Sequence, residues 1–288
     1  KALTVTEQLH DHYMLIGPDI HREEGNHEFE EDSTLLADWR ESMFNAGIRI
    51  RIGRWRVVGR PIAVLVDYTS LFPKKDDILK FLWETYHVDS ISGQWDYIEP
   101  VLFGHAAGQV IASYVENFCA STDKVVAHFH EWMTASGGLY LRKASPYVAT
   151  LFTTHATVTG RCIAGNGLPL YKDLGRLNAG ELARQFNVVA KHSIEKMAAA
   201  YHDAFLTVSD ITANECKYLL GREPDGVTPN GFENDFVWSG DVFDQKRKEA
   251  RKAMISVAEA CLGCKFEKEP LIIGTSGRYE FRNKGIDV

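Results

Sequence analysis

The sequence predicts an α/β fold with a mostly parallel sheet. Apolar runs of strand length alternate along the chain with longer stretches in which apolar residues recur every three or four positions. With 45% hydrophobic and 25% charged residues, the composition is that of a globular protein with a packed core. Strands that alternate with helices form βαβ units, whose strands run parallel.

The expected elements follow from this alternation. Strands are predicted at residues 13–17, 48–52, 62–67, 125–130, 147–153, 204–208, 227–229 and 271–274. Helices are predicted at residues 78–86, 100–118, 182–201, 211–220 and 243–261. The helix after Ser209 has Ser209 and Asp210 as caps, and Gly221 follows its last periodic residue.

Residues 48–67 depart from the βα rhythm. Two alternating runs flank Gly59 and Pro61, which is typical of an antiparallel hairpin. The first run carries four arginines, which suggest either an anion site or a solvated strand face, and the pattern favours the solvated face. They are Arg49, Arg51, Arg54 and Arg56.

The length, net charge and apolar runs of the chain limit its possible functions. The 288 residues are enough for one large domain or two modest ones, at about 150 residues per domain. The net charge of −7 argues against nucleic acid as a partner, because binding to phosphates needs a basic surface. No apolar run approaches the roughly 20 residues that span a bilayer, so we expect a soluble protein without a membrane partner.

The cysteines favour a reducing compartment. Five are spread unevenly along the chain, which suits reduced thiols in the cytoplasm better than a disulfide framework. Cys261 and Cys264 form one CxxC pair without a second pair or a nearby histidine, which leaves zinc short of ligands.

Polar residues follow four of the predicted strands. Ligands of open α/β sheets bind at the carboxyl ends of strands, so a site is expected where these loops meet. The loops span residues 127–132, 152–157, 228–231 and 276–285. His128, His130, Glu131 and His155 could be tested as zinc ligands, but no recurring metal-site spacing joins them, and we expect no metal.

The last of these loops has a clear electrostatic logic. Arg278 and Lys284 are cations on either side of a glycine-bounded turn, and Lys284 stands where a helix is predicted to begin. This arrangement suits a diphosphate, since arginine can bind two oxygens and lysine acts as a point charge. The alternative is a surface loop whose cations pair with Glu280.

Taken together, these motifs resemble those of the UDP-glucose-using glycogen synthase family. The shared stretches are VAHFHEW at 126–132, TTHAT at 153–157 followed by GR at 160–161, VTPNG at 227–231 and SGRYEFRNKG at 276–285. The resemblance implies a GT-B fold of two Rossmann-like domains, with residues 1–268 as the acceptor-side domain and 269–288 as the start of the nucleotide-sugar domain. It implies a retaining glucosyltransferase that extends an α-1,4-glucan (glycogen) from UDP-glucose, without a cofactor.

The resemblance also implies residue roles. Arg278 and Lys284 would hold the UDP diphosphate, and His155 would lie against the transferred glucose. Substrate-binding roles are expected, in the same way, for Arg161, Glu131, Trp132 and Asn230. Trp132 could stack on an acceptor glucosyl unit or belong to the core.

Two features of the family are missing from the motifs of this chain. The family's N-terminal glycine-rich loop and C-terminal glutamate pair are not found in the sequence, so we expect a fragment that is truncated at both ends and inactive alone. Alternatives are an ADP-glucose starch or glycogen synthase, a glucan phosphorylase of the same fold, or a non-catalytic glucan-binding protein. The oligomeric state is open, with a homo-oligomer of the full-length protein among the alternatives.

Overall fold

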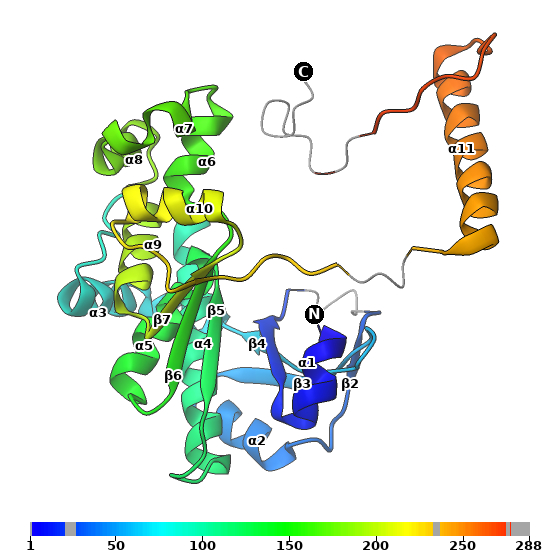
Figure 1. Ribbon diagram of the computed structural model, residues 1–288. Coiled ribbons are helices and arrows are strands. Elements are labelled where there is room, and N and C mark those ends of the chain that lie inside the picture. The colour runs from blue at the N-terminus through cyan, green and yellow to red at the C-terminus, as the bar shows by residue number, and fades with distance from the viewer. Residues whose placement is uncertain (1, 21–26, 233–236, 275–276, 278–288) are drawn as a thin grey trace. The chain divides into compact units, whose positions relative to one another are not determined.

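A computed structural model describes residues 2–20, 27–232, 237–274 and 277 (Figure 1). Contacts divide the chain into two units, Lys1–Pro229 and Asn230–Val288. The domain boundary predicted between residues 268 and 269 concerns the family's two domains and stays a prediction.

The first unit begins with a mixed four-stranded sheet in the order β1-β4-β3-β2. Its strands are β1 (Met14–Pro18), β2 (Phe29–Glu31), β3 (Arg49–Trp55) and β4 (Ile62–Asp67). β1 runs parallel to β4, whereas β3 runs antiparallel to β4 and β2. The predicted hairpin is thus confirmed, and its turn contains Gly59 at φ +93° and Arg60 at φ +40°.

Intramolecular partners occupy the three arginines of β3 and Arg56, which directly follows it. Arg51 pairs with Asp19 and Glu31, at 3.1 and 2.8 Å. Arg54 binds both carboxylate oxygens of Asp11 at 2.9 Å. In the same way, Arg56 lies 3.5 Å from Glu30, and Arg49 lies over the ring of Phe44. These four arginine side chains therefore contact the protein's own acidic and aromatic groups.

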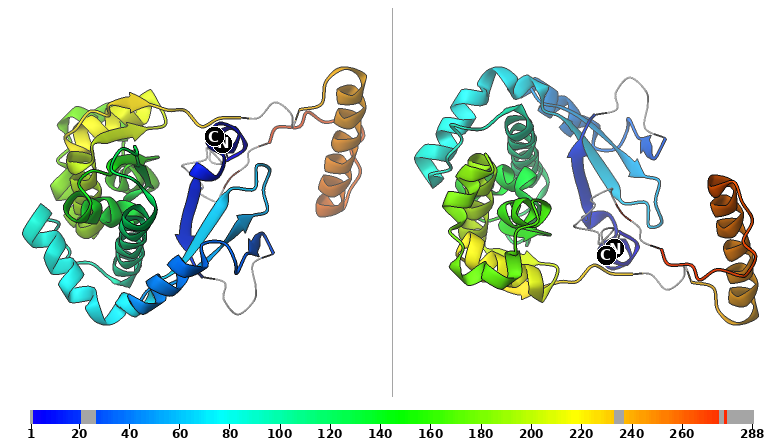
Figure 2. Two further views of the ribbon diagram at one scale, coloured as in Figure 1. Left: turned by 90° about the horizontal axis from the view of Figure 1, so that it is seen from below. Right: turned by 90° about the horizontal axis from the view of Figure 1, so that it is seen from above.

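Helices link this sheet to a second one. α1 (Ala2–Leu9) precedes β1, α2 (Ala37–Asn45) packs on β3, and α3 (Lys75–Tyr86) follows β4. The long α4 (Trp95–Phe118) contacts β1, β4 and α5 (Ala135–Ala144), and lies beside α5 in both views of Figure 2. One hydrophobic core joins side chains from both sheets with side chains of α2, α3, α4 and α5.

The second sheet is entirely parallel, as predicted. Its strands are β5 (Val126–His130), β6 (Ala149–Thr154), β7 (Ala204–Thr207) and β8 (Gly226–Val227), in that order across the sheet. Neighbouring strands pair in parallel throughout. The carboxyl ends of β5 to β8 therefore meet at one edge of the sheet, which fixes the place of the predicted site.

Shorter helices complete the first unit. They are α6 (Val158–Gly165), α7 (Leu170–Asp173), α8 (Ala179–Gln185), α9 (Val189–Tyr201) and α10 (Asp210–Glu215). The prediction of one helix over 182–201 was wrong, because Asn187 adopts φ +54° and separates α8 from α9. Ser209 caps α10 as predicted, and a π-helical segment (Cys216–Leu220) ends at Gly221 with φ +76°.

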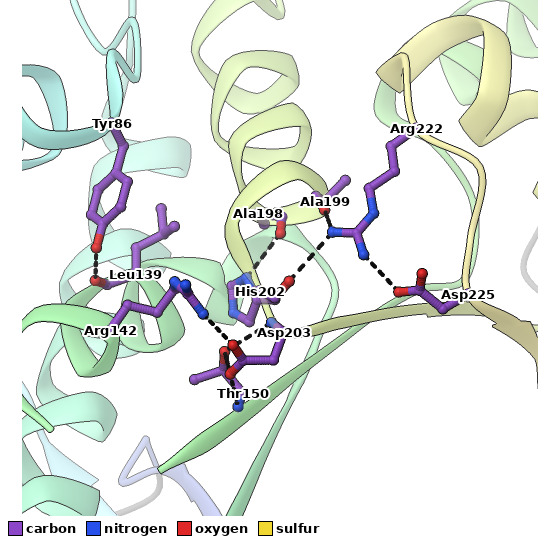
Figure 3. Close-up of polar contacts among 10 residues, drawn as sticks. All are labelled: Tyr86, Leu139, Arg142, Thr150, Ala198, Ala199, His202, Asp203, Arg222 and Asp225. Carbon is purple, nitrogen blue, oxygen red and sulfur yellow. Dashed lines mark hydrogen bonds and ion pairs between the residues drawn. The ribbon is translucent and has the colours of Figure 1, made fainter. Parts of the chain in front are cut away.

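The amino ends of β6 and β7 are joined by a polar network (Figure 3). Asp203 Oδ2 accepts hydrogen bonds from the backbone N–H and the hydroxyl of Thr150, at 2.7 and 2.8 Å, and Oδ1 binds Arg142 at 2.5 Å. Nearby, Arg222 binds Asp225 at 2.6 Å and also donates to the carbonyl oxygen of Ala199. This network fixes the sheet edge opposite to the site.

The second unit contains α11 (Gly240–Leu262), which ends at Gly263 with φ +69°. No residue of α11 is buried, in keeping with the charged sequence of its first half. The strand predicted at 271–274 was wrong: Leu271 and Ile273 are 85% and 87% exposed and have no strand pairing within the described residues. A strand needs a hydrogen-bonded neighbour, and apolar alternation alone does not supply one.

Candidate active site at the carboxyl ends of β5 and β6

Three of the predicted site residues meet where β5 and β6 end. Glu131 directly follows β5, His155 directly follows β6, and Arg161 lies in the first turn of α6. A parallel pair of strands places its two following loops side by side. The first loop thereby supplies the carboxylate, and the second supplies the imidazole and the guanidinium.

Glu131 joins the two loops. Its backbone N–H continues the sheet by donating to Thr153 O at 2.8 Å. Its side chain turns back, and Oε1 accepts a hydrogen bond from the backbone N–H of His155 at 3.1 Å. Its backbone adopts φ +65° and ψ 161°, a conformation that is essentially restricted to glycine. Any other residue in this conformation is strained by about 1–3 kcal/mol. A strained non-glycine residue in a loop with polar partners is typical of a functional site.

Histidine rings lie side by side along the exposed face of β5. The rings of His128 and His130 have centroids 4.1 Å apart, and His130 Nδ1 lies 3.3 Å from His155 Nε2. His128 Nε2 lies 2.7 Å from the hydroxyl oxygen of Thr153. Across the part of the chain that the structure describes, no group of three or more His, Cys, Asp or Glu side chains is placed to hold a metal ion.

Arg161 completes the group. Its guanidinium lies 3.7 Å from Glu131 Oε1, with 46% of the arginine side chain and 18% of the glutamate side chain exposed. An ion pair of this kind contributes little to stability. Its chemistry is more informative, because imidazole and guanidinium N–H groups donate to hydroxyl oxygens while a carboxylate accepts from hydroxyl groups. The three side chains together suit a polyhydroxylated ligand.

The loop that carries His155 is held by a buried carboxylate at its far end. The Thr157 hydroxyl donates to Glu215 Oε2 at 2.9 Å, and its oxygen accepts from the N–H of Gly160 at 3.1 Å, which caps α6. Tyr171 donates to Glu215 Oε1 at 2.9 Å. Burial, followed by this contact with Glu215, raises the pKa of Tyr171 to about 12, so its hydroxyl keeps its proton.

A second buried carboxyl group, that of Glu195 on α9, lies behind the same loop. Its Oε1 is 3.1 Å from Thr154 Oγ1, and its Oε2 accepts from the backbone N–H of Val158 at 2.9 Å. Burial raises the pKa of Glu195 to about 8, against the lowering effect of the hydrogen bonds from Val158 and Thr154. Glu131 raises this pKa further and Arg161 lowers it, so both interact with Glu195 electrostatically.

Sequence analysis missed both buried glutamates, although the spacing held a signal. Glu195 stands three and four positions before the buried Ala198 and Ala199, and Glu215 stands three positions after Thr212 and four before Leu219. A charged residue on the buried face of a helix is a candidate for a specific polar contact.

The remaining predicted site residues are Trp132, Asn230, Arg278 and Lys284. Trp132 stacks on Tyr97 at 6.0 Å between ring centroids and 13° between planes, and Lys191 Nζ lies 5.6 Å from its ring centroid. This packing supports a core role, and a sugar contact stays a prediction. Asn230 is exposed and begins the second unit. Arg278 and Lys284 lie outside the described residues, so their diphosphate role stays a prediction.

Comparison with known proteins places these motifs in one family. The sequence profile described as glycogen synthase matches residues 1–288. The chain is 31% identical over 294 residues to the glycogen [starch] synthase of Neurospora crassa and 30% identical over 295 residues to that of Dictyostelium discoideum. It is 29% identical over 303 residues to isoform 2 of Saccharomyces cerevisiae.

All of this chain is covered in each of these three comparisons, but it spans only 41%, 33% and 43% of the relatives' own lengths. The family has the GT-B architecture, and the α/β fold with its parallel second sheet is that of a Rossmann-like glycosyltransferase domain. Because the profile matches the whole sequence, this chain belongs to the glycogen synthase family, a family of glycosyltransferases.

Proposed function

We propose that the protein containing this chain transfers glucose, with retention of configuration, from UDP-glucose to the non-reducing end of an α-1,4-glucan in glycogen synthesis. The observation that carries the proposal is the grouping of Glu131, His155 and Arg161 at the carboxyl ends of β5 and β6. These residues come from two separate family motifs, and the structure brings them within hydrogen-bond or ion-pair distance.

The proposed reaction exchanges one bond at the anomeric carbon. The bond from C1 of glucose to the diphosphate oxygen breaks, and the diphosphate keeps the electron pair. The 4-hydroxyl oxygen of the acceptor bonds to C1, and its proton passes to the departing diphosphate oxygen. Arg278 and Lys284 are proposed to stabilise the negative charge on the departing UDP, which is the usual task of fixed cations at a leaving group.

The residues of the candidate site are assigned to the sugar. His155 and Arg161 offer N–H donors to glucose hydroxyl oxygens, and Glu131 holds the His155 backbone while its carboxylate accepts from a hydroxyl group. Fixing the sugar in this way orients C1 toward the acceptor, and such positioning contributes a large part of enzymatic rate enhancement. Trp132 and Asn230 are proposed as further sugar contacts, on the family motifs alone.

The test is glucose incorporation by the full-length protein. UDP-glucose carrying a radioactive label and glycogen are mixed with the wild type, His155→Ala, Arg161→Ala or Arg278→Ala. We expect transfer by the wild type and losses of orders of magnitude in Arg278→Ala, because it removes charge stabilisation in the transition state. Matched controls are Arg176→Ala, at an exposed position of the first unit, and Arg247→Ala on α11. Losses equal to those of the controls would remove these residues from the roles.

The same assay separates the alternative functions. An ADP-glucose synthase would prefer labelled ADP-glucose, and a phosphorylase would release glucose 1-phosphate and absorb as a pyridoxal phosphate enzyme. A non-catalytic protein would bind glycogen without incorporation. No cofactor is part of the proposal, so chelators should leave transfer unchanged. Analytical ultracentrifugation of the full-length protein tests whether it forms a homo-oligomer.

The cellular location is proposed to be the cytoplasm, where thiols stay reduced. Among the described residues, no helix is long and apolar enough to cross a membrane. The described cysteines form no disulfides. Cell fractionation with an antibody against this chain tests the location.

A further inference from the structure

Glu195 is a buried carboxyl group to which the proposed transfer gives no role. None of its surface is exposed, and a glutamate is rarely buried in this way unless its oxygens have hydrogen-bond partners. Both of its oxygens have partners here: Thr154 Oγ1 at 3.1 Å and the N–H of Val158 at 2.9 Å. One side chain of α9 thus connects the last residue of β6 to the first residue of α6, on either side of His155.

The contacts of Thr154 depend on the proton of Glu195. The Thr154 hydroxyl has two oxygen neighbours, Glu195 Oε1 at 3.1 Å and the carbonyl oxygen of Ala156 at 3.2 Å. A hydroxyl group donates one hydrogen bond and can also accept. If Glu195 is ionised, Thr154 can donate to only one of the two. If Glu195 carries a proton on Oε1, it donates to Thr154, and Thr154 donates to Ala156.

Only the protonated acid therefore satisfies both contacts at the same time. In that state a chain of hydrogen bonds runs from Glu195 through Thr154 to Ala156, the residue directly after His155. The N–H of Val158 still donates to Glu195 Oε2, which accepts in either state. Burial favours the same state, because a carboxylate loses more hydration than a neutral acid does.

The surroundings agree with a neutral acid near neutral pH. Burial raises the pKa of Glu195 to about 8. The charged groups that act on it are Glu131 after β5, which raises the pKa, and Arg161 of α6, which lowers it. On the π-helical segment, Cys216 is buried and interacts with Glu195, and burial raises the pKa of its thiol, so it adds no charge.

We propose that Glu195 is a positioning residue for the transferase reaction, whose protonated carboxyl group orders the turn at 154–156 and thereby orients His155 toward the sugar. Ionisation of Glu195 takes the Thr154 hydrogen bond away from Ala156 and loosens this turn. The catalytic part of this proposal rests on the proposed function, whereas the effect on His155 does not.

The first test compares pH profiles of kcat/KM for glucose transfer by the full-length wild type, Glu195→Gln and Glu195→Ala. The glutamine amide N–H can donate to Thr154 and its oxygen can accept from Val158, so this variant reproduces the protonated acid. We expect the wild type to lose activity with an apparent pKa near 8, by at most tenfold per pH unit above it. Glu195→Gln should show no such loss and should restore most of the turnover that Glu195→Ala loses.

Two results would overturn the proposal. One is a Glu195→Gln profile that falls between pH 7 and 9 as the wild type does. The other is a folded Glu195→Gln protein with no more turnover than Glu195→Ala, where thermal melting establishes folding.

The second test separates this inference from the proposed function. In the same full-length proteins labelled with ¹³C at histidine Cε1, the His155 resonance is assigned by its loss in His155→Gln. We expect its shift between pH 7 and 9 to be larger in the wild type than in Glu195→Gln, since contributions from other titrating groups are common to both proteins. If the wild type transfers no glucose but the larger shift is present, the proposed function fails and the positioning by Glu195 stands. If the two shifts are equal, the positioning fails.

Discussion

The backbone N–H of His155 donates a hydrogen bond to Glu131 Oε1 over 3.1 Å, so the residue after β5 holds the residue after β6. Glu131 makes this contact from φ +65° and ψ 161°, where side chains other than glycine are strained. The continued pairing of its N–H with Thr153 O and the carboxylate contact together maintain that conformation. The strained backbone of Glu131 lowers stability, whereas its carboxylate fixes His155, the residue that we propose contacts the sugar.

Replacing Glu131 should separate these two effects. In Glu131→Ala the backbone stays strained and the carboxylate is lost, whereas Glu131→Gly removes the strain as well. We expect Glu131→Gly to be more stable than Glu131→Ala by about 1 kcal/mol, because relief of about 1–3 kcal/mol of strain exceeds the entropy cost of glycine. Urea denaturation of this chain measures the difference. Equal stabilities would mean that position 131 is not strained.

The variants Glu131→Ala and Glu131→Gly also test the role of Glu131 in glucose transfer. Both variants should transfer glucose about 100-fold more slowly than the wild type in the full-length protein, since a loop shift of about 1 Å at a reacting centre has effects of that size. Full activity in the more stable Glu131→Gly would show that the carboxylate has no part in the reaction.

Local signals explain how far the sequence predicted the fold. Alternation around Gly59 and Pro61 predicted the β3–β4 hairpin, and apolar runs predicted β5, β6 and β7, because both depend on neighbours in sequence. The break at Asn187 was missed because apolar residues keep the helical spacing on both sides of it, and only the backbone at φ +54° reveals it. Residues 271–274 read as a strand but have no strand partner in the described chain.

The candidate site was predicted in part for the same reason. The parallel order of β5 and β6 brings Glu131, His155 and Arg161 together, so strand ends and motifs were sufficient. The role of Glu195 needs α9 to pack behind the loop, and that tertiary contact spans about 40 positions in sequence. Trp132 was predicted as a sugar contact or a core residue, and its stacking on Tyr97 supports the core role. No local pattern connects these two residues, so the sequence did not reveal this contact.

Close packing between α4 and α5 makes a prediction about Gly137. A Cβ atom added there would lie 2.4 Å from the carbonyl oxygen of Gly104 and 2.8 Å from the ring of Phe129. Backbone cannot move aside cheaply, so Gly137→Ala should destabilise this chain by about 1–3 kcal/mol or more. The matched control is Gly180→Ala in α8, where the nearest atom is 3.5 Å away and alanine should be neutral or stabilising. Equal denaturation midpoints for the two variants would contradict the close packing of α4 against α5 at Gly137.

The network at the amino ends of the strands makes a prediction about Asp203. Burial would raise the pKa of Asp203, but the hydrogen bonds from Thr150 and Arg142 outweigh it and lower the pKa. A lowered pKa means that the carboxylate stabilises the fold above the unfolded pKa and that this contribution disappears as pH falls through the folded pKa. Asp203→Asn should therefore cost about 1–2 kcal/mol at pH 7, discounted for the half-exposed side chain, and less as the pH falls through the folded pKa.

Asp244→Asn, at an exposed position of α11, is the control for this measurement and should have no effect at pH 7 or in acid. If Asp203→Asn keeps its full cost in acid, the loss comes from shape and not from charge.

Three buried histidines should stay neutral in mild acid. Burial lowers the pKa of His105, His192 and His202 to about 4 in each case. An unfolded chain binds protons at these residues near pH 6.5 and the folded chain does not, so folding weakens as pH falls from 6.5 toward 4. In a ¹³C-histidine NMR titration, three resonances should stay unchanged down to pH 5. Replacement of each histidine by glutamine assigns them, and a midpoint near 6.5 for any of the three would contradict its burial.

Glu195 should make the fold less stable as the pH rises, whereas the three histidines make it less stable as the pH falls. Its pKa is 4.5 in the reference state and about 8 in the fold, so between these values the folded chain holds a proton that the unfolded chain releases. This contribution to stability is complete below pH 4.5 and decreases as pH rises to 8, by up to about 1.4 kcal/mol per pH unit for one proton.

The stability test compares the wild type with Glu195→Gln, which cannot ionise. Their free energies of unfolding in urea should diverge in favour of Glu195→Gln as pH rises from 6 to 8, while the slope with denaturant stays constant. Other titrating groups are common to both proteins and cancel in the difference. Because the carboxyl group has partners on both sides of His155, the pH at which the difference stops growing should match the apparent pKa of the activity profile. Two different midpoints would separate the stability of the fold from the order of the His155 turn.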